Sequence, residues 1–76
     1  MKEALGTIIN SLVTDKEAVS ITETQNEGIT VLEVKVAEND MGRVIGRDGK
    51  MAKSIRTIMK ALASKEGKKV NVEFLD

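Results

Sequence analysis

The stretch V-I-G-R-D-G-K-M-A-K-S-I, residues 44–55, places two glycines three positions apart in a sequence that otherwise favours a helix. Glycine inside a helix costs about 1 kcal/mol relative to alanine, so Gly46 and Gly49 predict a break between two helices. The helical spacing of apolar residues resumes directly after Gly49. The stretch therefore indicates two helices joined by a tight loop that carries no side chain at two of its positions.

The segments beside this loop predict its two helices. A short helix is expected over about residues 41–45, with Asn39-Asp40 as its N-terminal cap. A longer helix is expected from about residue 50 to 64, and Gly67 ends it. Its predicted buried stripe is Ala52, Ile55, Met59 and Leu62, with Met51 and Ile58 at the margins.

The rest of the chain predicts a first helix and three strands. Residues 3–14 carry apolar side chains at helical spacing. Residues 18–24 and 29–37 alternate as a hairpin around a turn at 25–28, and Val70, Val72 and Phe74 alternate in a last strand. The order α-β-β-α-α-β predicts an α+β two-layer sandwich, with a three-stranded mixed sheet and three helices on one face. We expect one domain over residues 1–76 and a right-handed crossover if two strands are parallel.

The composition argues against several classes of protein. The 76 residues include no cysteine and no histidine, which removes thiolate metal sites, disulfides and the commonest general base. The serines have no visible base beyond nearby lysines, so we expect no enzyme activity. We also expect no metal, no cofactor and no small-molecule substrate. No apolar run approaches the roughly 20 residues of a membrane span, and the N-terminal segment does not resemble a secretory signal. The expected compartment is the cytoplasm.

The charge of the chain is zero overall but unevenly distributed. Residues 1–42 hold three bases and eight acids, a net charge of −5, whereas residues 43–69 hold nine bases and two acids, a net charge of +7. Such asymmetry is typical of a protein that binds a polyanion, although a solvated lysine-rich helix face gives the same pattern.

Four interpretations of the glycine loop can be compared. A Walker phosphate loop fails because Val44 stands where its first glycine belongs and Met51 where its hydroxyl belongs. A dinucleotide turn fails because it also needs a glycine at position 44. The loop could be only a corner, with Gly46 as a helix C-cap. It could instead be an anion cradle, in which free amides, including those of Lys50 and Met51, bind phosphate beside the start of a helix.

The segment Ile45-Gly46-Arg47-Asp48-Gly49, followed by Ala52 and Ile55, resembles the K-homology (KH) signature I-G-x-x-G-x-x-I. The element order is similar to the type II KH arrangement, and the resemblance covers essentially the whole chain. In KH domains the GXXG loop clamps about four unpaired nucleotides. The chain most resembles the small bacterial single-KH proteins of the KhpA (YlqC) family, which implies that it binds single-stranded RNA. The expected RNA-binding residues are Arg43, Val44, Ile45, Gly46, Arg47, Asp48, Gly49, Lys50 and Lys53.

These residues are expected to act in different ways. Loop amides hold phosphates, Arg47 is the charged contact, and the lysines and Arg43 form a positive rim. Bases lie in a groove between the short helix and the second strand, walled near Met41, Val44 and Ile45, although the last two could instead lie wholly in the core. Asp48 departs from the usual basic or polar loop residues, and we expect it to cap the following helix rather than face a phosphate.

The single aromatic residue, Phe74, is expected on the apolar face of the last strand, so stacking platforms are absent and sequence discrimination should be low. The resemblance further implies a homodimer or a heterodimer with a KhpB (Jag) protein. It also implies an RNA-chaperone or post-transcriptional role in cell elongation, division and cell-wall homeostasis. The alternative is a protein dimerisation module that does not bind RNA by itself.

Overall fold

The computed structural model describes residues 1–75 and has the expected order of elements. Its three helices and three strands are α1 (Lys2–Leu12), β1 (Ser20–Asn26), β2 (Ile29–Lys35), α2 (Met41–Ile45), α3 (Lys50–Lys65) and β3 (Lys69–Leu75). Short 3₁₀ turns lie at Lys16–Ala18, Glu38–Asp40 and Arg47–Gly49. The predicted α-β-β-α-α-β order is therefore confirmed.

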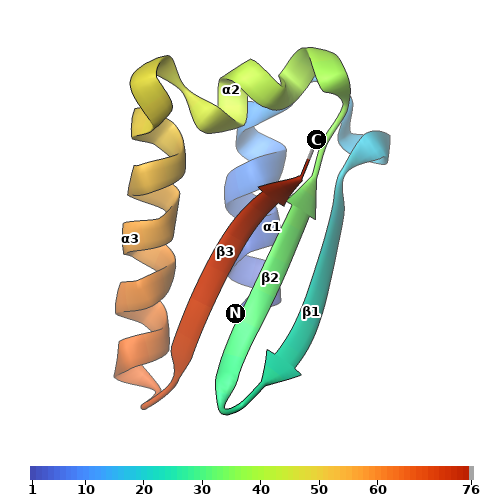
Figure 1. Cartoon of the computed structure of the whole chain (residues 1–76). Helices are drawn as coiled ribbons and strands as arrows, with labels where there is room; N and C mark the ends of the chain where they lie inside the picture. Colours follow the sequence, from blue (N-terminus) through green and yellow to red (C-terminus); the bar gives the residue numbers. More distant parts are fainter. Residues whose placement is uncertain (76) are drawn as a thin grey trace.

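The three strands form one mixed sheet in the order β1-β2-β3. β1 pairs antiparallel with β2, and Ile21 lies opposite Val34. β2 pairs parallel with β3, and Leu32 lies opposite Val72. In Figure 1, α1 lies behind the sheet, α3 lies beside β3, and α2 crosses the end at which β2 leaves the sheet. The two-layer α+β architecture is the predicted one, and it places the α2–α3 loop at one end of the molecule.

The hairpin differs from its predicted boundaries. β1 extends to Asn26, two residues beyond the expected end, and the turn consists of Glu27 and Gly28 alone. Both have positive φ, 53° and 82°, which suits the two-residue turn that matches the twist of antiparallel strands. The longer strand also lets the Gln25 side chain donate to the hydroxyl of buried Thr30 at 3.0 Å.

The core lies between the helices and the sheet. It brings together apolar side chains of all three helices with those of β2 and β3, and its largest fully buried members are Leu5, Ile9, Leu32, Ile55 and Met59. Each such side chain contributes roughly 1.5–3 kcal/mol by leaving water. Met51 and Ile58 are 36% and 47% exposed, which agrees with their predicted marginal positions on α3.

Two further observations concern the described residues. None of the helices in residues 1–75 is both long and apolar enough to cross a bilayer. Within the same range, the carboxylates do not gather into a group that could hold a metal ion.

Candidate nucleic-acid interface

The backbone of the loop turns through three residues with positive φ. Gly46 ends α2 with φ 78° and ψ 175°, Asp48 has φ 56°, and Gly49 has φ 74°. The amide of Lys50 donates to the carbonyl of Arg47, which closes a tight turn around Asp48 and Gly49. This turn changes the direction of the chain between α2 and α3, so the break predicted from the two glycines is confirmed.

Gly46 is required by packing inside the loop. A Cβ at this position would lie 2.6 Å from the Cβ of Met51 and 2.8 Å from its amide nitrogen. Its φ and ψ also fall in a region that essentially only glycine occupies. The corner interpretation therefore explains Gly46 fully.

Gly49 is different, because no atom lies within 4 Å of the place where its Cβ would be. Its positive φ favours glycine, but no neighbouring group needs the space. At Gly49 the loop is thus bare backbone open to the surroundings. Another molecule can approach the chain closely at this point.

The loop also has backbone donors to offer. The amide of Gly46 donates to Gly42 and that of Gly49 donates to Gly46, at 2.9 and 3.2 Å. Arg47 and Asp48 are exposed and begin the 3₁₀ turn, so the turn itself contains no acceptor for their amides. Their amides are therefore the candidates for binding an anion. The prediction that the Lys50 amide is free is wrong, because this amide donates to the carbonyl of Arg47 and closes the turn.

The predicted capping role of Asp48 is also wrong. The residue before α3 is Gly49, and no side chain caps this helix. Asp48 is exposed and occupies the left-handed conformation, which aspartate tolerates better than most residues. Its carboxylate therefore adds a negative charge at the exposed tip of the loop.

Basic side chains surround the loop. Arg47, Lys50 and Lys53 are exposed and form no ion pair within residues 1–75. Lys50 and Lys53 lie in the first turn of α3, where the helix dipole disfavours a cation by about 0.3–1 kcal/mol. Their placement is unfavourable for the helix alone and becomes favourable when an anion lies nearby.

Arg43 is held by a buried acid. Its Nε lies 3.3 Å from Oδ1 of Asp40, and its side chain remains 57% exposed. Arg43 thus faces solvent from α2 as predicted, but part of its charge is offset by Asp40.

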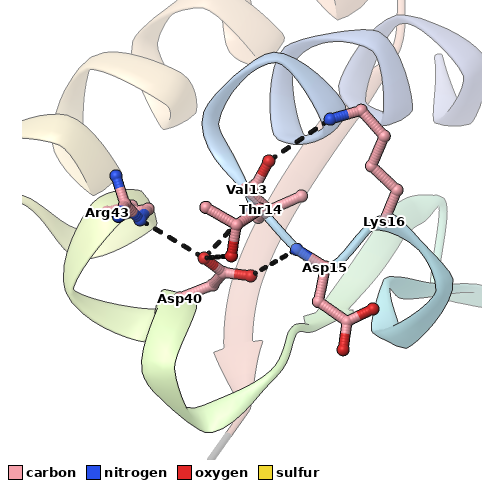
Figure 2. A network of polar contacts seen from close by, with 6 residues as sticks. All are labelled: Val13, Thr14, Asp15, Lys16, Asp40 and Arg43. Atoms are coloured by element: carbon pink, nitrogen blue, oxygen red, sulfur yellow. Dashed lines mark hydrogen bonds and ion pairs between the residues drawn. The ribbon is translucent and has the colours of Figure 1, made fainter.

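Asp40 connects α2 to the segment that follows α1. Its carboxylate is fully buried and accepts hydrogen bonds from the amide and hydroxyl of Thr14 and from the amide of Asp15, at 3.0, 2.9 and 3.0 Å (Figure 2). The hydrogen bond from the Asp15 amide, with those from Thr14 and the charge of Arg43, lowers the pKa of Asp40 despite its burial. Asp40 occupies the predicted N-cap position of α2, but its side chain makes no capping bond, because its oxygens are bonded to Thr14 and Asp15 instead.

The apolar wall of the predicted groove is only partly present. Val44 is fully buried, so its predicted contact with a base is wrong, because its side chain is enclosed by the core. Met41 and Ile45 are partly buried and pack at the edge of that core. A hollow of about 540 Å³ lies where β2 leads into α2, lined by Lys35, Val36, Glu38 and Met41.

Arg56 is a basic residue of α3 that was not among the predicted site residues. Its Nε donates to the carbonyl of Val72 at 3.0 Å, and its guanidinium carbon lies 5.4 Å from the centre of the Phe74 ring. These contacts depend on α3 lying beside β3. No local sequence signal could have revealed them.

A type II KH domain is the class of protein that this fold and loop define, and comparison with known proteins gives the same result. The family model described as "KhpA/KhpB, KH domain" matches residues 2–74. The chain belongs to this family.

Three curated relatives share nearly their full length with it. RNA-binding protein KhpA of Clostridium acetobutylicum is 49% identical over 75 residues, which cover 99% of this chain and 100% of the relative. The KhpA proteins of Caldanaerobacter subterraneus and Listeria monocytogenes are 44% and 38% identical, with 99–100% of this chain and 100% of each relative covered.

Solved structures show the same fold within a larger protein. Aquifex aeolicus Era bound to GDP.AlF4- and Era in complex with MgGDPNP and nucleotides of 16S ribosomal RNA give TM-scores of 0.64 and 0.65 at 20% identity. Each match covers 96% of this chain and 28% of the Era chain. At this identity the likeness concerns the fold alone.

Proposed function

We propose that this protein binds single-stranded RNA through the sugar–phosphate backbone, with the loop 46–49 as the clamp. The observation that carries the proposal is the open outer side of Gly49, next to the amides of Arg47 and Asp48 at the start of the 3₁₀ turn. Backbone donors and an unobstructed approach are what a phosphate needs, and they carry no preference for a base. The names of the curated KhpA relatives support RNA as the ligand.

The basic side chains around the loop supply the charged part of the clamp. Arg47 contacts phosphate, and Lys50, Lys53 and Arg43 form the rim of the site. Met41 and Ile45 offer apolar surface to the bases, whereas Val44 supports the site from the core. With few groups that read a base, sequence discrimination is low.

In the cell, we propose action as an RNA chaperone or post-transcriptional regulator, as a homodimer or with a KhpB (Jag) partner. The proposed context is cell elongation, division and cell-wall homeostasis in the cytoplasm. Membership of the KhpA/KhpB family is the support for this broader role.

The test is fluorescence anisotropy of a labelled mixed-sequence single-stranded RNA with the wild-type protein and Gly49→Asp. Gly28→Asp is the matched control, because Gly28 also has positive φ with no atom within 4 Å of the added Cβ. It lies in the β1–β2 turn, at the opposite end of the molecule from the loop (Figure 1). Gly49→Asp should lose binding and Gly28→Asp should keep it.

Salt provides a second readout. Each phosphate neutralised on a single strand contributes about −0.7 to the slope of log K against log salt. Arg43 is paired with Asp40, so the three remaining cations Arg47, Lys50 and Lys53 predict a slope of about −2. Equal binding by both glycine variants would contradict the clamp. Failure of the wild-type protein to bind at low salt would favour the alternative, a KH fold kept for dimerisation.

A further inference from the structure

The helix α3 is strongly positive, and this charge does not stabilise the helix by itself. The sixteen residues Lys50–Lys65 include five bases and no acid, so none of these cations has an ion-pair partner within the helix. Surface helices usually place acids three or four residues from bases. Self-repulsion along α3 is therefore uncompensated unless an anion lies against it.

Three of these bases lie on one flank. Lys53, Arg56 and Lys60 follow a spacing of three and four residues, which aligns them along one side of the helix. The contacts of Arg56 with Val72 and Phe74 show that this side faces β3. β3 is one of the two edge strands of the sheet, so the flank borders an open margin rather than another strand.

The flank ends in a hollow lined by lysines, far from the glycine loop. This hollow has a volume of about 480 Å³ and is lined by Lys60, Ser64, Gly67, Lys68 and Lys69, with Ile29, Val70 and Asn71. Glu66 lies 3.8 Å from Lys68 and offsets that one charge, whereas Lys60 and Lys69 form no ion pair within residues 1–75. In Figure 1 the start of β3 and the end of α3 lie at the end of the molecule opposite the glycine loop.

We infer that an RNA strand held at the glycine loop continues along this flank of α3 and ends in the basic hollow. The inference rests on the proposed RNA binding and extends its footprint. From Gly49 to Lys60 the helix rises about 16 Å, and this path is separate from the groove proposed between α2 and β2. Arg56, fixed by Val72 and Phe74, is the ordered cation midway along this path.

The experiment compares labelled single-stranded RNAs of about four and about twelve nucleotides, by anisotropy and by NMR titration of the ¹⁵N-labelled protein. The short RNA should shift amide signals around residues 41–53 and leave those of Lys60, Ser64 and Gly67 unchanged. The long RNA should also shift those of Lys60, Ser64 and Gly67, and it should bind roughly tenfold more tightly with a steeper salt slope.

The variant Lys60→Gln with Lys69→Gln tests the far end of the path. Both residues are exposed, so the fold should persist. This double variant should lose the advantage of the long RNA and bind the short RNA as the wild-type protein does. The matched control is Lys2→Gln with Lys65→Gln, which removes the same charge from exposed positions off this flank and should keep the advantage.

The possible outcomes separate the two proposals. Equal affinity of the wild-type protein for both RNAs would overturn the extended path and leave the loop clamp standing. An equal loss in the control variant would also overturn it, because net charge would then explain the effect. If neither RNA binds the wild-type protein, the proposed function and this inference fail together.

Discussion

A methyl group added at Gly46 would meet Met51, whereas one added at Gly49 would enter open space. The first glycine is explained by how α2 meets α3. The second leaves an exposed strip of backbone, and the proposed RNA clamp rests on this difference.

Replacement of the two glycines by alanine should separate these roles. Gly46→Ala adds the contact with Met51 to a backbone strain of about 1–3 kcal/mol, so a loss of at least about 2 kcal/mol in the free energy of unfolding is expected. Gly49→Ala should cost only about 1–2 kcal/mol, from the left-handed conformation alone. Urea unfolding followed by circular dichroism measures both. Equal losses would contradict the steric account of Gly46.

Removal of the Asp48 charge should strengthen RNA binding. Asparagine accepts the left-handed backbone at this position as well as aspartate does, so Asp48→Asn should leave the fold unchanged. A nearby surface charge is worth up to about 1 kcal/mol, so the affinity should rise severalfold at low salt and little at high salt. Anisotropy titrations at two salt concentrations test this. An unchanged affinity at low salt would mean that the carboxylate lies away from the phosphates.

At the scale of elements, Asp40 is the connection that fixes α2. Thr14 and Asp15 follow α1 and lie about 25 residues away in sequence from the carboxylate that accepts their hydrogen bonds. Because α2 leads directly into the glycine loop, this connection also sets the position of the loop.

The lowered pKa of Asp40 predicts a specific pH dependence. A carboxyl whose pKa is lower in the folded state stabilises the protein above its unfolded pKa of about 3.9, and this stability is lost as the pH falls through the folded value. Asp40→Asn should therefore destabilise the protein at pH 7, and the difference from wild type should narrow toward pH 2. Unfolding free energies measured across this range test the prediction. A difference independent of pH would contradict it.

Adjacent residues of α3 should respond very differently to truncation. Met59 is fully buried, so Met59→Ala should cost about 2–5 kcal/mol through lost contacts and a cavity. Ile58 is 47% exposed, and Ile58→Ala should cost less than about 1 kcal/mol. Urea unfolding of both variants measures the contrast. Similar costs for the two variants would contradict the assignment of the buried face of α3.

At the scale of the whole molecule, one core connects all the elements. The radius of gyration of 11.9 Å is close to the roughly 11 Å of a compact chain of this length. The buried residues form a single cluster shared by helices and sheet. No part of the described chain has a core of its own.

A single cooperative unfolding transition is therefore expected. The free energy of unfolding should be about 4–11 kcal/mol, the usual range for this length. The calorimetric enthalpy should equal the van't Hoff enthalpy. Two separate transitions would contradict the prediction of one domain over the whole chain.

Much of the fold followed from local patterns. The apolar spacings of α1 and α3 located both helices within one or two residues, and α2 was placed at its observed bounds. The first strand was placed too early because the propensity of Gln25 and Asn26 for turns was outweighed by their pairing with β2. The glycine loop and the charge division were visible in the sequence.

The sequence by itself determined the periodicities, the glycine break and the location of positive charge, because each depends on residues a few positions apart. Only the tertiary structure decided the roles of Asp40, Val44 and Arg56. The hydrogen-bond partners of Asp40 and Arg56 lie 16 to 26 residues away, and the burial of Val44 depends on which elements enclose it. Such contacts arise from how helices and sheet pack together, and no short segment of sequence specifies that packing.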